Sequence, residues 1–347
     1  MQELKPSDVM RVLEGVIGVR KPILIAGAPG VGKSDLVAQA AARRGHELII
    51  SHPVVSDPTD FKGMPFPVIE KGVAEFLPFG DLAQVLGCTR PTVWFLDDIG
   101  QAPAAVQAAL MQPMLARAIN GKQIPECVTM IGATNRRQDR AGVSGLLEPV
   151  KSRFLSILHM KADLNDWKTW AYANEVHEAV IAFLTFRSEL LHQFVATADL
   201  TNSPCPRTWG HASTVLKMGL GAEVEQVVLA GAVGEGAASE LSAYAKMYRE
   251  LPDLDEVLKK PEKATIFGEK DAHVQWAMCV GLASRTTEKN FPAIVTYAER
   301  LVEKNKGEFA VVLVRDALRK ERKVAKTPAF VKLGNGPFGD VVNGVEE

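Results

Sequence analysis

The sequence is poor in the residues and patterns that mark secreted, metal-bound or membrane proteins. Its 347 residues include four cysteines, which lie far apart and have neither CxxC spacing nor a histidine at zinc-ligand spacing. This argues against a disulfide framework and a zinc site. No uncharged stretch reaches the roughly 18–20 residues of a membrane span, and the charged N-terminus lacks the apolar run of a signal peptide. We therefore expect a cytoplasmic protein.

An excess of charge of one sign is missing as well. Lysine and arginine number 40 and aspartate and glutamate 41, which gives a formal net charge of -1. This balance offers no whole-molecule argument for binding nucleic acid or an anionic membrane. The basic run at 319–323 is interrupted by Glu321 and contains no aromatic residue, so a solvated helix face is favoured over a nucleic-acid contact.

Apolar runs typical of strands alternate with helical patterns in the first 160 residues. The strand-like runs occupy 22–27, 46–55, 91–98, 127–135 and 154–160. Such alternation predicts the α/β class, with a mainly parallel sheet flanked by helices.

The rest of the chain is different in character. Residues 56–80, rich in proline and glycine, favour a loop with a hairpin, and helical patterns dominate after about residue 163. We expect an α/β core at 1–160, a helical domain at 161–260, and a helical C-terminal extension at 261–347 with a loosely ordered tail.

A glycine-rich turn follows the first strand-like run. GAPGVGKS fits the pattern G-x-x-x-x-G-K-[ST] at every position, between an apolar strand and a helix. In this pattern backbone N–H groups surround the β-phosphate, the lysine reaches the β- and γ-phosphate oxygens, and the hydroxyl binds Mg²⁺. The sequence therefore predicts a site for ATP with Mg²⁺. Its predicted nucleotide-binding residues are Gly27, Ala28, Pro29, Gly30, Val31, Gly32, Lys33 and Ser34.

Two acids end the apolar run VWFLDD. Asp97 is expected at the carboxyl end of a buried strand beside the glycine-rich turn, where a carboxylate can hold the hydration shell of Mg²⁺. Ser34 and Asp97 are thus the predicted metal ligands. Asp98 is placed to orient or deprotonate an attacking water, which makes it a predicted catalytic residue.

The order of GAPGVGKS, VWFLDDIGQAPAAVQAALM, IGATNRR and KSRF resembles the AAA+ superfamily, and within it the chain is most similar to the MoxR-like ATPases. The matched blocks extend from about residue 20 to 155, with a short match at 203–209. The resemblance implies a P-loop NTPase core with a helical lid, a homo-oligomeric ring or spiral such as a hexamer, and ATP hydrolysis that remodels, matures or activates a partner protein. A partner with a von Willebrand factor A domain is also implied.

The resemblance assigns catalytic roles to three further residues. Asn135 matches the sensor 1 residue that positions the attacking water. Arg153 matches the arginine finger, which reaches the γ-phosphate bound by the adjacent subunit. Arg207, in the segment PRTW, matches the sensor 2 arginine of the lid.

The segment DPTDFKGMPF lies where these families carry a substrate-facing insert, which implies that Phe61 and Met64 are exposed apolar contacts. One position departs from the family pattern, since Asp98 stands where most members have glutamate. Aspartate is one methylene shorter, which sets its carboxylate on the order of 1 Å further back. Slow or partner-stimulated hydrolysis is therefore expected.

Two other functions share the same core motifs: a nucleic-acid motor or loader, and a nucleotide-dependent scaffold with slow hydrolysis. Salt-dependent DNA binding would identify the first, and a phosphate-release assay the second.

Two metal-like patterns are weak. The pair His177-Glu178 begins like HExxH but has Ile181 at the position of the second histidine, so it predicts a helix surface. The residues around His52 favour a turn with solvated side chains.

Overall fold

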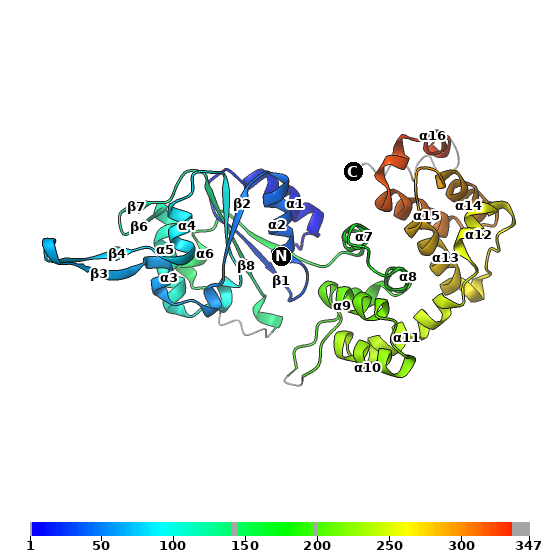
Figure 1. Cartoon of the computed structure of the whole chain (residues 1–347), viewed down its shortest axis with the longest axis horizontal. Coiled ribbons are helices and arrows are strands. Elements are labelled where there is room, and N and C mark those ends of the chain that lie inside the picture. Colours follow the sequence, from blue (N-terminus) through cyan, green and yellow to red (C-terminus); the bar gives the residue numbers. More distant parts are fainter. Residues whose placement is uncertain (1, 140–144, 198–199, 335–347) are drawn as a thin grey trace. The chain divides into compact units, whose positions relative to one another are not determined.

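The computed structural model describes residues 2–139, 145–197 and 200–334. The chain divides into two compact units, Met1–Asp163 with Phe194–Ala198, and Leu164–Gln193 with Asp199–Glu347. We call them the α/β unit and the helical unit (Figure 1). A further division of the second unit near residue 260 remains a prediction.

A five-stranded sheet forms the centre of the α/β unit. Its strand order is β2-β5-β8-β1-β9, and every neighbouring pair is parallel. The three inner strands are buried along their whole length, which explains why they appear in the sequence as continuous apolar runs. The strands are β1 (Ile23–Gly27), β2 (Glu47–Ser51), β5 (Thr92–Leu96), β8 (Val128–Thr134) and β9 (Ile157–Met160).

Helices cover both faces of this sheet (Figure 1). Successive side chains of a strand point to opposite faces: Ile23 and Ile25 pack in one apolar cluster with α1 and α2, and Leu24 packs in another with α3, α4 and α5. The α/β class with a parallel sheet flanked by helices is confirmed. The helices are α1 (Pro6–Val16), α2 (Lys33–Arg43), α3 (Pro58–Lys62), α4 (Gly80–Leu86), α5 (Ala104–Ala116) and α6 (Glu148–Lys151).

Two antiparallel hairpins project from the α/β core. The hairpin of β3 (Met64–Val68) and β4 (Val73–Leu77) confirms the hairpin predicted within 56–80, and it extends well away from the sheet (Figure 1). The second, of β6 (Ala118–Ile119) and β7 (Lys122–Gln123), is short.

The prediction that Phe61 is an exposed contact is wrong. A capping box formed by Asp57 and Asp60 starts the short helix α3, and this helix turns the Phe61 ring inward. The ring is 2% exposed and its centroid lies 6.3 Å from that of Trp94. Met64, the other expected contact, is 55% exposed.

In its described residues the helical unit contains no strand. One of its apolar clusters is formed mainly by α13, α14 and α15, and a buried ion pair between Lys168 and Asp316 joins α7 to α15. The helices are α7 (Leu164–Ala173), α8 (Glu178–Phe186), α9 (Pro206–Lys217), α10 (Ala222–Val233), α11 (Glu235–Arg249), α12 (Leu254–Lys259), α13 (Ala272–Ser284), α14 (Phe291–Glu303), α15 (Gly307–Lys320) and α16 (Pro328–Gly334). Over the ranges 2–139, 145–197 and 200–334, no helix has both the length and the apolar character needed to cross a membrane.

Candidate functional site

The glycine-rich turn lies at the carboxyl edge of the sheet, between β1 and α2. Gly30 and Gly32 have φ angles of 74° and 94°, in the left-handed region that favours glycine. At Gly27 a Cβ atom would lie 2.9 Å from the carbonyl oxygen of Met160 on the neighbouring strand. The turn therefore needs glycine at three positions, and its predicted residues 27–34 form one continuous loop and helix start.

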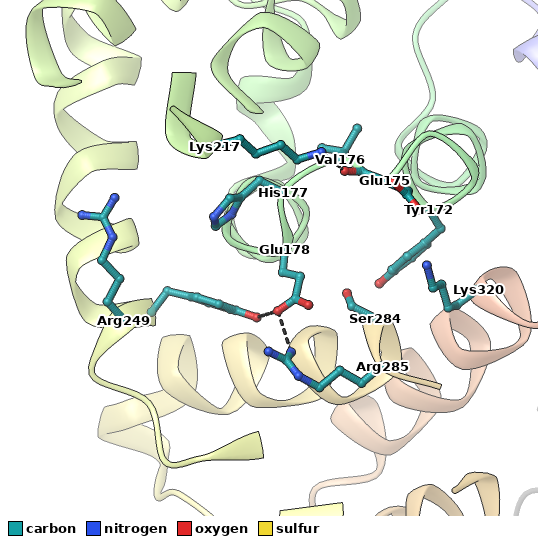
Figure 2. A pocket seen from close by; sticks show the side chains of 11 residues that line it. Tyr172, Glu175, Val176, His177, Glu178, Lys217, Arg249, Ser284, Arg285 and Lys320 are labelled. Carbon is teal, nitrogen blue, oxygen red and sulfur yellow. Dashed lines mark hydrogen bonds and ion pairs between the residues drawn. The ribbon is translucent and has the colours of Figure 1, made fainter. Parts of the chain in front are cut away.

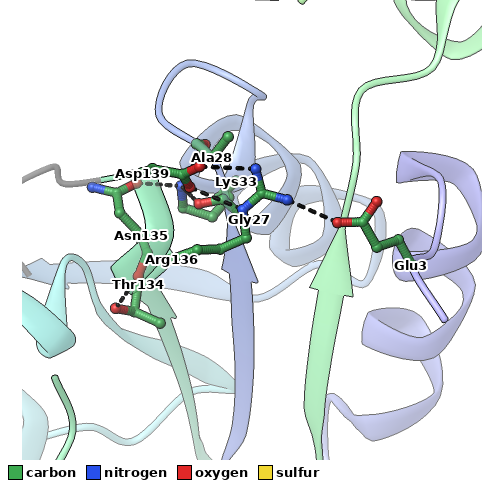
Figure 3. Close-up of polar contacts among 8 residues, drawn as sticks. All are labelled: Glu3, Gly27, Ala28, Lys33, Thr134, Asn135, Arg136 and Asp139. Carbon is green, nitrogen blue, oxygen red and sulfur yellow. Dashed lines mark hydrogen bonds and ion pairs between the residues drawn. The ribbon is translucent and has the colours of Figure 1, made fainter. Parts of the chain in front are cut away.

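Lys33 is the first residue of α2, and its side chain folds back over the turn. The residue is 7% exposed, and Nζ donates hydrogen bonds to the carbonyl oxygens of Gly27 and Ala28, both at 3.0 Å, and to Oδ1 of Asn135 at 2.7 Å (Figure 3). These three acceptors are neutral oxygens. An ammonium in this position would bind the oxygens of a phosphate more strongly, because the opposite charges of the two groups also attract each other.

Ser34 and Asp97 meet beside the turn. The Ser34 hydroxyl donates to Oδ2 of Asp97 at 2.8 Å, and the backbone N–H of Asp97 bonds the carbonyl of Ser51 on the adjacent strand at 2.9 Å. A hydroxyl and a carboxylate are oxygen ligands of the kind that Mg²⁺ prefers, with substrate phosphates and water completing its shell. The pair fits the predicted metal, and the described residues contain no cluster of three or more metal-binding side chains that would suit another ion.

Asp98 has a left-handed backbone, with φ 54° and ψ 34°. Its Oδ1 accepts one hydrogen bond from Gln101 Nε2 at 2.7 Å and one from Asn135 Nδ2 at 3.3 Å. Asn135 thus connects Lys33 to Asp98 through the two ends of its amide. The structure brings the predicted residues Lys33, Ser34, Asp97, Asp98 and Asn135 together at one edge of the sheet.

Two residues of this edge were not predicted. Arg136 follows Asn135 and bonds Asp139 through two nitrogens, each at 2.9 Å, and Glu3 at 2.8 Å (Figure 3). The hydrogen bonds with Asp139 raise the pKa of Arg136. Gln101 could have been suspected from its position three residues after Asp98, the spacing of a tight turn.

Arg153 makes its described hydrogen bonds to backbone groups outside this cluster. The Nε of Arg153 donates to the carbonyl of Met111 at 3.1 Å, and its Nη1 donates to the carbonyl of Pro149. Arg207 is exposed in the first turn of α9, in the helical unit. Their roles at the nucleotide remain predictions.

The helical unit contains a polar cavity of about 590 Å³ (Figure 2). Three of the basic residues that line it, Lys217, Arg249 and Lys320, are the last residues of α9, α11 and α15. Cations at helix C-termini are stabilised by the helix dipole.

Other charged or polar side chains that line this cavity form ion pairs and hydrogen bonds within the helical unit. Arg249 bonds Glu225 at 2.7 and 2.9 Å, and Arg285 bonds Glu178 at 2.6 Å. His177 caps α8, because its Nδ1 accepts a hydrogen bond from the backbone N–H of Ala179 at 3.1 Å. Burial lowers the pKa of His177. These charges are accounted for by helix capping and ion pairing.

No model of a known protein family matches the chain. Among solved structures it is similar to a point mutant of Thermotoga maritima RuvB, at 18% identity over 80% of this chain and 83% of that chain, with a TM-score of 0.43. It is also similar to T. maritima RuvB described as a Holliday junction branch migration motor (17%, 86% of each chain, TM-score 0.42). A third is NtrX from Brucella abortus in complex with ATP (12%, 99% of this chain and 68% of that chain, TM-score 0.40). All three TM-scores lie below 0.5, so no functional conclusion follows from these likenesses.

Proposed function

We propose that this protein is a MoxR-like ATPase of the AAA+ superfamily, which binds ATP with Mg²⁺ at the carboxyl edge of its sheet and hydrolyses it. The observation that carries the proposal is the convergence of Lys33, Ser34, Asp97, Asp98 and Asn135 within hydrogen-bonding distance of one another. These residues come from the turn after β1, the end of β5 and the end of β8, so the arrangement depends on the fold and not on one motif.

Each residue has a defined part in the proposed reaction. Lys33 exchanges the carbonyl oxygens of Gly27 and Ala28 for β- and γ-phosphate oxygens of ATP. Ser34 and Asp97 would hold Mg²⁺, which would neutralise charge on the phosphates. Asp98 accepts a proton from the attacking water, and Asn135 orients that water. The water oxygen bonds to the γ-phosphorus as the bond to the bridging oxygen breaks, which releases ADP and phosphate.

The assembly and partner are part of the same proposal. A homo-oligomeric ring or spiral, such as a hexamer, would let Arg153 serve the γ-phosphate of the adjacent subunit and Arg207 touch the nucleotide of its own subunit. Light scattering with and without an ATP analogue tests this assembly, and a monomer at tens of micromolar under both conditions would contradict it.

The β3–β4 hairpin is the proposed contact with a partner protein that the ATPase remodels or activates. Its exposed apolar side chains support this role, since apolar groups gathered on a projecting element are typical of interaction sites. Met64 is 55%, Phe66 56% and Ile69 89% exposed. A protein with a von Willebrand factor A domain is the proposed class of partner.

Phosphate release from ATP with Mg²⁺, measured on the wild type and on Asp98→Asn, tests the proposed activity. We expect the wild type to turn over and Asp98→Asn to bind ATP while losing about 10²-fold or more in rate, because an amide cannot accept the proton. Asp271→Asn is a matched control, since Asp271 is exposed, caps no helix through its side chain and lies in the other unit. Wild-type turnover by Asp98→Asn would refute the catalytic assignment, and a wild type that binds but never hydrolyses ATP would favour a nucleotide-dependent scaffold.

A further inference from the structure

Gln101 lies directly against the proposed catalytic carboxylate. It ends the 3-10 turn η3 (Ile99–Gln101), which begins after Asp98, and its backbone N–H bonds the Asp98 carbonyl at 3.0 Å. The turn brings the side chain back, so that Nε2 donates to Oδ1 of Asp98 at 2.7 Å. Backbone and side chain of Gln101 therefore both hold Asp98.

The orientation of this amide is set by Asp98. The other end of the amide, Oε1, is buried and has no hydrogen-bond partner among the described residues. Rotating the amide by half a turn would place Oε1 against a carboxylate oxygen, with which it cannot share a hydrogen. Among the described residues Oε1 thus has no donor while Nε2 stays on Asp98, and a catalytic role is one of the reasons for which a fold keeps such a group.

Gln107, six residues further on, shows what a glutamine with a purely structural role looks like in the same unit. Its Nε2 donates to the carbonyls of Ala102 and Gly145, both at 3.0 Å, and its Oε1 accepts from the backbone N–H of Leu147 at 2.9 Å. Both polar atoms of this buried amide are bonded to backbone groups, of Ala102 nearby and of Gly145 and Leu147 further along the chain. The amide of Gln101 has its contact with a side chain of the proposed reaction instead.

We propose that Gln101 is the positioning residue that holds the Asp98 carboxylate for attack by water; this rests on the proposed hydrolysis. Asp98 needs such a hold because its side chain is one methylene shorter than glutamate and projects from a left-handed backbone. Asn135 is the second donor to Oδ1, but its hydrogen bond is longer, at 3.3 Å. Asn135 is also bonded to Lys33, and Lys33 must turn to the phosphates when ATP binds. The Gln101 contact does not include Lys33. Since both amides use Oδ1, Oδ2 is left to receive the proton of the water.

The test compares Gln101→Met with Gln107→Met in steady-state phosphate release, ATP binding and thermal unfolding. Methionine keeps the length and volume of the side chain but cannot donate to a carboxylate. We expect Gln101→Met to lower kcat by about 10-fold, because small displacements of a reacting group are costly, while the KM and the Kd for ATP stay at their wild-type values.

The thermal stability should distinguish the two variants the other way round, because Gln107→Met should lose more stability than Gln101→Met. Gln101→Met removes the hydrogen bond to Asp98 but also a buried acceptor without a donor, so its Tm should change little, whereas Gln107→Met leaves two carbonyls and one N–H without partners and should lower the Tm more. The kcat per folded molecule of Gln107→Met should equal that of the wild type. Gln101→Glu, which places a second carboxylate against Asp98, should lose more turnover than Gln101→Met.

Wild-type kcat in Gln101→Met, with turnover still abolished in Asp98→Asn, would overturn this inference and leave the proposed hydrolysis intact. A loss of turnover in Gln101→Met that is fully explained by a smaller folded fraction would also overturn this inference. Full turnover in Asp98→Asn would instead refute the proposed reaction, and this inference with it.

Discussion

Each of the two units buries a lysine, and the partners of the two lysines differ. In the α/β unit, Lys33 is hydrogen-bonded to neutral oxygens of the glycine-rich turn and of Asn135. In the helical unit, Lys168 is 2% exposed and bonds the carboxylate of Asp316, which is fully buried. Burial lowers the pKa of Lys168, and the neighbouring Asp316 opposes this effect.

On the proposed function, this difference separates a charge that serves the fold from one that binds a ligand. The Asp316 carboxylate also accepts a hydrogen bond from Tyr172 at 2.9 Å and pairs with Arg319, so its contacts join α7 and α15 within the unit. A buried charge with such partners is satisfied without any ligand. Lys33 has neutral acceptors that phosphate oxygens can replace, which is the arrangement expected at a site for anions.

The largest expected effect concerns Arg153, whose charge would serve a neighbouring subunit. A guanidinium on the γ-phosphate stabilises the charge of the transition state and contributes about 10³–10⁵ in rate in related phosphoryl transfers. Arg153→Ala should therefore lose most turnover, measured as phosphate release, while each subunit still binds ATP.

Mixing Arg153→Ala with Lys33→Ala tests whether the arginine acts between subunits. Each variant alone should be inactive, but a mixed ring would contain interfaces with both an intact glycine-rich turn and an intact Arg153. Recovery of part of the turnover on mixing is expected, provided that the ring does not need every site to fire. Full activity of Arg153→Ala alone would show that its bonds to the carbonyls of Met111 and Pro149 are its whole role.

Asp316→Ala should destabilise the helical unit and leave the affinity of the nucleotide site unchanged. Removing one partner of a buried ion pair leaves an uncompensated charge, which costs about 3–5 kcal/mol of unfolding free energy. Urea unfolding measures the loss, and the affinity of the folded protein for ATP should not change. Asp255→Ala is the control, because Asp255 is exposed and its ion pair with Arg285 is long at 3.7 Å; such pairs contribute less than about 1 kcal/mol. Equal losses from both variants would contradict the structural role of Asp316.

The smallest expected effect is a pH dependence of the helical unit at His177. Burial lowers the pKa of this imidazole in the folded state, so the unfolded state binds the proton more readily. The stabilisation is therefore present above the unfolded pKa of about 6.5 and is lost as the pH falls through the folded pKa.

Protonation of Nδ1 would also end its hydrogen bond from Ala179, an N-cap contact of about 1 kcal/mol. His177→Asn keeps an N-cap acceptor that does not titrate. Urea unfolding at pH 7.5 and 5.5 should show a smaller loss of stability in His177→Asn than in the wild type. Identical losses would show that other groups produce the pH dependence.

The sheet was predicted correctly from the sequence, and five of the predicted site residues lie together in the structure, because both the sheet and these positions depend on local patterns. Apolar runs locate the buried strands, and the glycine-rich motif fixes the position of Lys33 within its turn. Phe61 was wrongly predicted to be exposed because its burial depends on α3, a five-residue helix. The capping box starts this helix within a segment whose proline and glycine residues favour a loop. Gln101 was missed because its contact with Asp98 depends on the 3-10 turn that follows Asp98, and a spacing of three residues does not by itself show that a turn forms. The cavity of the helical unit is formed by helix ends far apart in the sequence, and no local pattern predicts such a meeting.

The central claim is that the carboxyl edge of the sheet binds ATP through Lys33, and calorimetric titration of ATP with Mg²⁺ into the wild type and Lys33→Ala tests it most directly. We predict binding by the wild type and a loss of at least about 10²-fold in affinity in Lys33→Ala, because charge-assisted hydrogen bonds to the phosphates contribute about 1.5–3 kcal/mol each. Thermal unfolding of the two proteins without nucleotide is the folding control, and the affinities are compared per folded molecule. Unchanged affinity in Lys33→Ala would contradict the account.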